Sequence, residues 1–185
     1  MKRRMVLAGM ATAVALAMTG TAALAHGPSR QKVALEVKLN ATPAEVWAVV
    51  GNFYDMSWHP VVAETQGDGS MDADKSTRVL VLKSDADPKP TIKEVLAKYN
   101  PEKMSYGYRI EEVSIDVLPV TNYASTITVK DDGGKATVEW KGGFYRGNPL
   151  NNPEPQYNDE AAVKAVTAVY QAGLDALAEK FGKRE

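Results

Sequence analysis

Hydrophobic and polar residues alternate along several segments of the chain, beginning with KVALEVKLN at residues 32–40. There Val33, Leu35 and Val37 lie on one side of an extended chain, which is typical of a half-buried β-strand. Later segments predict further strands: STRVLVLK (76–83), PTIKEVLAKYN (90–100, whose pattern also permits a helix), KMSYGYRIEEV (103–113), TNYASTITVK (121–130) and KATVEWKGGFY (135–145). The Asp-Asp-Gly-Gly sequence at 131–134 predicts a hairpin between the last two.

A second pattern, with apolar residues three and four positions apart, predicts helices. In ATPAEVWAVVGN (41–52), Thr42 is a candidate N-cap, Pro43 suits the first helical position, and Gly51 ends the helix. The next segment, FYDMSWHP, predicts a short second helix around residues 54–58, which Pro60 ends.

The C-terminal part of the chain predicts one long amphipathic helix. Asn158 or Asp159 can cap it, and Gly173 lies within it, which predicts close packing or a bend at that position. Its apolar face consists of Val163, Val166, Tyr170, Leu174, Leu177 and Phe181. The preceding loop, residues 147–159, is rich in Asn and Pro and is longer than most connections, so a functional role is expected there.

This order of elements predicts an α+β fold. A curved antiparallel sheet needs a cover for its apolar face, and the C-terminal helix is the long element available to cover it. We expect the sheet to wrap around that helix, with two short helices after the first strand and a cavity between the layers.

The N-terminus predicts export. Lys2, Arg3 and Arg4 precede a short apolar run that ends in Ala23-Leu24-Ala25, the order of a secretory signal peptide. We expect cleavage after Ala25, a periplasmic location, and a single domain over residues 26–185 without a membrane segment. A retained anchor is the alternative. The paired arginines also permit twin-arginine export, although ordinary secretion fits the sequence better.

Composition excludes several classes of function. Removal of residues 1–25 from the 185-residue chain leaves 19 basic and 23 acidic residues, a balance unsuited to nucleic-acid binding. The chain has no cysteine, which excludes disulfides, thiol catalysis and cysteine-bound metals. It has neither a C-x-x-C-H haem motif nor a glycine-rich dinucleotide loop, so no cofactor is predicted.

Five segments carry a family resemblance: ATPAEVWAVVGNFYDMSWHPVV, YNPEKMSYGYRI, VLPVTNYASTITV, VEWKGGFYRG and NDEAAVKAVTAVYQAGLDAL. Together they resemble the MxaD-type periplasmic proteins of bacterial methanol oxidation, a branch of the START-like helix-grip (SRPBCC, polyketide cyclase/dehydrase-like) superfamily. The resemblance implies a helix-grip fold and a non-catalytic accessory role. That role would assist electron transfer from periplasmic methanol dehydrogenase to its c-type cytochrome, both of which would be protein partners.

The aromatic residues have two interpretations. At strand spacing they are core residues, and in a helix-grip fold they can also form the wall of a pocket for a small apolar ligand. The candidates for such a cavity wall are Trp58, His59, Tyr106, Tyr108, Tyr123, Trp140, Phe144 and Tyr170. A periplasmic carrier of a small hydrophobic ligand is therefore the alternative function.

Catalysis and metal binding have weak support in the sequence. His59 with Tyr106 or Tyr108 could act as the general acid or base of a cyclase-like enzyme, but no paired-carboxylate or Ser-His-Asp spacing accompanies them. His26 and its free amine could bind copper, although two histidines are a weak signal. We predict neither a catalytic residue nor a metal site.

An exposed rim is the expected docking surface. Its candidate contact residues are Tyr54, Met56, Tyr145 and Arg146, of types enriched at protein interfaces. The loop at 147–159 extends the same edge in the sequence.

Overall fold

The computed structural model describes residues 27–67 and 69–185. The predicted signal peptide at 1–25, its cleavage point and the possible metal ligand His26 lie outside the described residues. Among the residues described, no helix combines the length and apolar character needed to cross a membrane.

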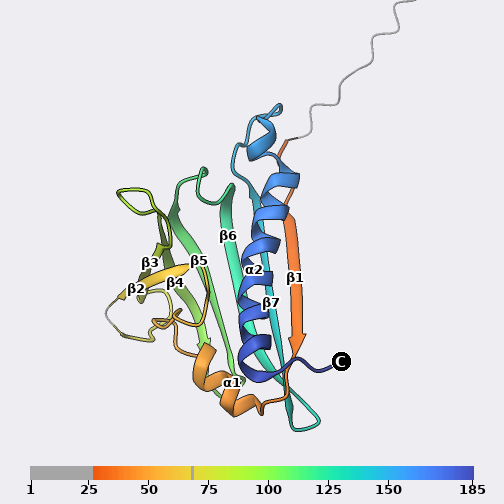
Figure 1. The fold of residues 1–185 in the computed structure, drawn as a ribbon. Coiled ribbons are helices and arrows are strands. Elements are labelled where there is room, and N and C mark those ends of the chain that lie inside the picture. Colours follow the sequence, from red (N-terminus) through yellow and green to blue (C-terminus); the bar gives the residue numbers. More distant parts are fainter. Residues whose placement is uncertain (1–26, 68) are drawn as a thin grey trace, which may run out of the picture.

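The described residues form a seven-stranded antiparallel sheet in the order β1-β7-β6-β5-β4-β3-β2 (Figure 1). Its strands are β1 (Gln31–Lys38), β2 (Val62–Gly67), β3 (Thr77–Leu82), β4 (Thr91–Asn100), β5 (Ser105–Val113), β6 (Val120–Asp132) and β7 (Lys135–Arg146). Each segment predicted to be a strand is one, including the ambiguous PTIKEVLAKYN in β4. The strand β2 was not predicted, because only its first residue is buried and it shows no alternation.

Two features fix the register of strands β1, β6 and β7. Gly133 and Gly134 both have positive φ, so the predicted hairpin turns in two residues and places Asp132 opposite Lys135. The N-terminal strand β1 then pairs with β7, from Gln31 opposite Phe144 to Lys38 opposite Thr137. This pairing brings the first and last strands of the chain side by side, and Val33, Val37 and Leu39 are buried in the core.

The helix α1 (Pro43–Val50) begins and ends as predicted. The Thr42 hydroxyl accepts a hydrogen bond from the Glu45 amide, the Glu45 carboxylate accepts from the Thr42 amide, and Gly51 is the C-cap. The predicted second helix around 54–58 is wrong, because residues 52–61 form turns. The Asn52 and Asp55 side chains accept hydrogen bonds from amides two residues later, and such bonds compete with helix formation.

The long helix α2 (Asp159–Phe181) follows a short 3₁₀ turn η1 (Pro155–Tyr157) and is capped by Asn158. Figure 1 shows it lying across the sheet in front of β7 and beside β1. Its buried face consists of Ala162, Val166, Tyr170, Gly173, Leu174 and Leu177. The sheet therefore wraps around α2 as predicted, and the fold is α+β.

Candidate functional site

Gly173 and His59 meet where α2 packs over Trp140 of β7. A Cβ on Gly173 would lie 2.7 Å from His59 Cδ2 and 2.8 Å from Trp140 Cζ3, so the missing side chain creates the space for both rings. The predicted close packing at Gly173 is confirmed, and the helix continues through it.

His59 is 1% exposed and is held by the backbone on both sides. Its Nε2 lies 3.0 Å from the carbonyl oxygen of Val169, which can only accept, so Nε2 carries the proton. Its Nδ1 is then an acceptor, 3.4 Å from the Val61 amide nitrogen. Burial lowers the pKa of His59, and the nearby positive charges of Arg78 and Lys83 act in the same direction against the Val169 bond. The imidazole is therefore neutral.

Buried hydroxyls form a network beside this histidine. The Tyr170 hydroxyl lies 2.7 Å from that of Tyr123 and 2.8 Å from Ser125 Oγ, and Ser125 also donates to the Lys141 carbonyl. Trp140 Nε1 lies 3.0 Å from Ser125 Oγ and 3.1 Å from the Tyr108 hydroxyl. The side-chain polar atoms of this network are thus paired inside the protein, whereas Trp58 Nε1 and the Tyr106 hydroxyl nearby are buried without a hydrogen-bond partner.

Backbone geometry and ring stacking set this arrangement. A Cβ on Gly142 would lie 2.3 Å from the Tyr170 hydroxyl, so this glycine in β7 allows the tyrosine to reach the sheet. The Tyr170 ring stacks on Trp140 with 4.5 Å between centroids. Burial raises the pKa of Tyr108 and Tyr123 well above the usual value, and raises that of Tyr170 to about 12. These hydroxyls stay protonated at any physiological pH.

A buried ion pair lies on the neighbouring strands β3 and β4. Arg78 Nε donates to Glu94 Oε2 at 2.6 Å, and Arg78 Nη1 donates to the Phe53 carbonyl oxygen at 2.5 Å. The guanidinium also lies over the rings of Phe53 and Tyr108. Burial lowers the pKa of Arg78 and is the largest single influence on it, but the charge and hydrogen bond of Glu94 together with Tyr106 and Tyr108 outweigh burial, so the net direction is upward. Burial raises the pKa of Glu94, and Arg78 opposes that rise.

A cavity of about 80 Å³ lies between this ion pair and α2. Its wall combines His59, Arg78, Glu94, Tyr108, Tyr123 and Trp140 with the apolar residues Met56, Val61, Val62, Leu80, Leu82, Ile92, Ile110, Val117, Leu118 and Val169. Pockets for larger ligands usually occupy roughly 300 Å³ or more, so this cavity is suited to a small molecule. The exposed side chain of Val61 lies at its edge.

The structure divides the predicted cavity wall into two groups. His59, Tyr108, Tyr123 and Trp140 line the cavity. The remaining candidates are packed in the core and do not line the cavity: Trp58, Tyr106, Phe144 and Tyr170. Tyr170 is the clearest case, because it turns toward Gly142 and stacks on Trp140.

The predicted docking rim needs correction. Met56 is 3% exposed and lines the cavity, and Arg146 is 5% exposed, so neither lies on an exposed rim. Tyr54 and Tyr145 are half-buried: the ring of Tyr54 covers Gly67, and that of Tyr145 lies under Arg30. The turn geometry of residues 52–61 draws Met56 inward, and the chain after β7 draws Arg146 inward.

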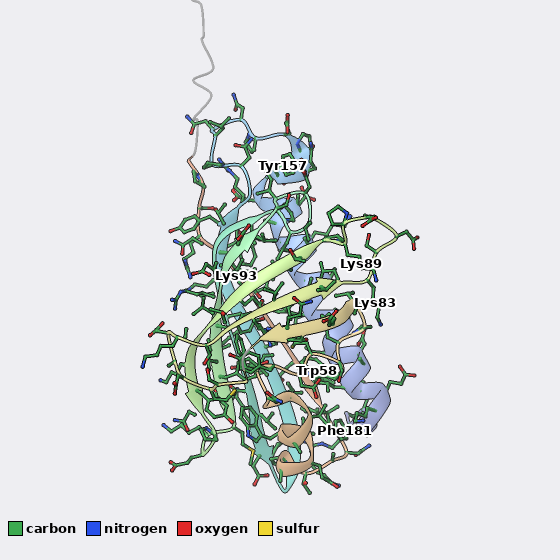
Figure 2. All side chains as sticks on the ribbon, turned by 90° about the vertical axis from the view of Figure 1, so that its left-hand side faces the viewer. Trp58, Lys83, Lys89, Lys93, Tyr157 and Phe181 are labelled. Atoms are coloured by element: carbon green, nitrogen blue, oxygen red, sulfur yellow. The ribbon has the colours of Figure 1, made fainter. Side chains whose placement is uncertain are left out.

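Arg146 is buried because it organises the predicted functional loop. Its Nε donates to the Asn148 carbonyl, its Nη2 to the Leu150 carbonyl, and its Nη1 to the Asp159 carboxylate. The Tyr157 hydroxyl donates to the Asp116 carboxylate and ties η1 to the neighbouring turn. Figure 2 shows Tyr157 at the end of the molecule opposite Phe181. At this end, Leu150 is 66% exposed on a loop that is held in place.

Sequence reasoning missed the charged residues of the site. Arg78 and Glu94 each occupy an inward position on a strand, where the alternating pattern predicts an apolar residue. A charged residue at an inward strand position is the signal that could have found them. Among residues 27–67 and 69–185, no three His, Asp or Glu side chains are arranged to hold a metal ion.

A curved antiparallel sheet closed by a long C-terminal helix, with an aromatic cavity between them, defines a helix-grip protein. The chain belongs to the family described as polyketide cyclase / dehydrase and lipid transport, which matches residues 30–182. This family contains both binding proteins and enzymes. A comparison with curated proteins found no match.

Solved structures agree with this assignment. XoxI from Bacillus cereus is 27% identical, with a TM-score of 0.65 over 81% of this chain and 94% of that one. A putative uncharacterized protein from Bacillus thuringiensis is also 27% identical, with a TM-score of 0.63 over 83% and 98%. Norcoclaurine synthase from Thalictrum flavum, in complex with dopamine and hydroxybenzaldehyde, is 16% identical, with a TM-score of 0.59 over 91% and 96%. At that identity the synthase shares the fold alone.

Proposed function

We propose that this protein is a non-catalytic periplasmic accessory protein of methanol oxidation. In this role it promotes the encounter of methanol dehydrogenase with its c-type cytochrome and so speeds electron transfer between them. The motif resemblance to MxaD-type proteins supports this function. The likeness to XoxI supports a closer relationship to that bacterial protein than to the plant synthase, because it has the higher identity over nearly all of that chain.

The histidine and the tyrosines of the interior are not arranged as general acids or bases. Both ring nitrogens of His59 have backbone partners, and the hydroxyls of Tyr108, Tyr123 and Tyr170 are bonded to one another or to their neighbours. A general acid or base needs a pKa near the working pH and a free path to its substrate. The raised tyrosine pKa values and the paired imidazole of this site do not meet that requirement.

The loop at residues 147–158 is the surface best suited to dock a protein. The Arg146 guanidinium holds two of its carbonyl groups, so little conformational entropy is lost when a partner binds. Leu150 presents an exposed apolar side chain from this ordered backbone, and an exposed apolar residue at a fixed position favours insertion into a pocket of a partner. The loop and its Leu150 therefore carry the proposal on the structural side.

The test follows cytochrome reduction by methanol dehydrogenase with and without the full chain. We expect a faster rate that falls as salt screens the encounter. Leu150→Asp should raise the concentration needed for half of the effect by roughly 10-fold, because a carboxylate is costly to bury in an apolar pocket.

Val61→Asp is the matched control, since Val61 is an exposed valine at the cavity edge, away from the loop. It should leave the stimulation unchanged. An unchanged rate with the wild-type protein at every salt concentration contradicts the accessory role. A loss in Val61→Asp but not in Leu150→Asp instead moves the docking surface to the cavity edge.

A further inference from the structure

The cavity beside β3 and β4 has a polar floor within a mostly apolar wall. Leu80, Leu82, Ile92 and Ile110 provide apolar surface, whereas Arg78 and Glu94 contribute charged groups at nearly full burial. Such a floor is energetically costly unless its polar atoms find partners. A bound molecule can pair only with those polar atoms that have no partner within the protein.

Most polar atoms of the wall are already paired within the protein. His59 bonds to the backbone through both nitrogens, and the hydroxyls of Tyr108 and Tyr123 have Trp140 and Tyr170 as partners. These groups shape the cavity without offering a strong contact to a ligand.

The ion pair is different, because each of its two residues has a polar atom that is not hydrogen-bonded to protein. Arg78 uses Nε and Nη1, and Glu94 uses Oε2. Within the described part of the chain, neither Arg78 Nη2 nor Glu94 Oε1 forms a hydrogen bond of normal geometry to protein, and neither is among the fully buried unpaired atoms. The Tyr106 hydroxyl, which is buried without such a bond, interacts with the Arg78 guanidinium but does not line the cavity. Because Arg78 and Glu94 line the cavity, Nη2 and Oε1 are the donor and the acceptor that it offers.

The charges of this pair select against ions. An anion attracted by Arg78 also meets Glu94, and a cation attracted by Glu94 also meets Arg78, so a charged ligand gains little for its desolvation. A neutral group that both accepts and donates can pair with Arg78 Nη2 and Glu94 Oε1 together. A hydroxyl is the smallest such group.

The volume of the cavity limits the size of the ligand. At roughly 10–15 Å³ for each water-sized group, the 80 Å³ cavity accepts about five to eight such groups. A lipid chain is too long for this space and an aromatic ring is too bulky, since a cavity that holds benzene measures about 150 Å³, whereas a short-chain alcohol fits.

We propose that the cavity binds a small neutral hydroxyl compound, with the hydroxyl between Arg78 and Glu94 and the hydrocarbon part against Leu80, Leu82 and Ile92. This binding site goes beyond the accessory role, and a negative result here leaves that role unaffected.

The test titrates the full chain with 1-butanol and follows tryptophan fluorescence, because Trp140 lines the cavity. Pentane, butanoate and butylamine serve as probes of similar size without the hydroxyl, with a negative charge and with a positive charge. We expect saturable binding of 1-butanol at least about tenfold tighter than that of the other three, since each of them leaves a polar atom of the floor unpaired or opposed.

Variants on α2 place the ligand. Val169→Phe fills the cavity from its helical wall and should abolish binding, whereas Val163→Phe, at another half-buried valine of α2 outside the wall, should retain it. Val117→Phe is a second blocking variant, from the turn after β5, in case Val169→Phe does not fold. Three results would each overturn the proposal: pentane or butanoate binding as tightly as 1-butanol, no saturable binding of 1-butanol, or an equal loss of binding in Val163→Phe.

Discussion

Gly173→Ala separates two opposing effects at the centre of the fold. Alanine favours the helix over glycine by about 1 kcal/mol, so the substitution should stabilise a helix that packs loosely. In this structure the added methyl group instead meets two rings. Its Cβ would lie 2.7 Å from His59 Cδ2 and 2.8 Å from Trp140 Cζ3, well short of the 3.4 Å at which ordinary contact begins.

The magnitude depends on whether those rings can move. The bond from Nε2 to the Val169 carbonyl holds His59, and stacking on Tyr170 and hydrogen bonds from Nε1 hold Trp140. Overpacking of a core of this kind costs roughly 1–3 kcal/mol. After the gain in helix propensity is subtracted, we expect Gly173→Ala to lower the free energy of unfolding by up to about 2 kcal/mol.

Urea unfolding followed by circular dichroism measures this change, and a loss of each kcal/mol should lower Tm by about 2–4 °C in a domain of this size. Ala168→Gly is the control, because Ala168 is exposed on the same helix and reports helix propensity alone. It should lose about 1 kcal/mol. If Gly173→Ala is instead more stable than the wild-type protein, the rings do not fix the helix at this point and the packing argument fails.

Three further predictions concern the site. Burial lowers the pKa of His59 below its usual 6.5, so the unfolded chain binds the proton first as the pH falls. The contribution of His59 to the free energy of unfolding should therefore be constant above about pH 6.5 and should fall below that pH by up to about 1.4 kcal/mol per pH unit. Urea unfolding at about pH 7.5 and 5.5 measures this loss, and His59→Gln should remove it. Tyr170→Phe deletes two short hydrogen bonds and leaves the Tyr123 hydroxyl buried, so it should cost about 2 kcal/mol of unfolding free energy in the same assay, against little change in Tyr145→Phe on the outer face. Arg146→Lys replaces three donor nitrogens by one and should increase limited proteolysis within residues 147–158 by roughly 10-fold, whereas Arg30→Lys should not; unchanged cleavage contradicts the role of Arg146 in ordering the loop.

Local patterns predicted the fold where one physical effect dominated. The alternating segments around Val33 and Trp140 form strands as predicted. Thr42 and Pro43 begin α1 and Gly51 ends it, as the chemistry of these residues requires. The second helix failed because Asn52 and Asp55 satisfy backbone amides in turns, which a count of apolar positions does not include. The β2 strand was missed because pairing with β3 supports it, rather than its own pattern.

The site was predicted less completely than the fold. Residue type and strand face indicated that Tyr108, Tyr123 and Trp140 turn inward, but not which aromatic side chain lines the cavity and which packs against the cluster. Arg146 was expected at a surface, since arginine is mostly exposed. Its burial depends on carbonyl groups of the following loop, which no spacing rule places around it.

By itself, the sequence determined the elements of this protein: their faces, their caps, the closing helix and the aromatic character of the interior. These follow from interactions between residues close in the chain, such as the alternation along a strand and the cap at a helix end. The tertiary structure alone decided the pairing of Arg78 with Glu94, the contact of His59 with Gly173, and the cavity between them. Those features join segments far apart in the chain, and their geometry is set only when the sheet closes around α2.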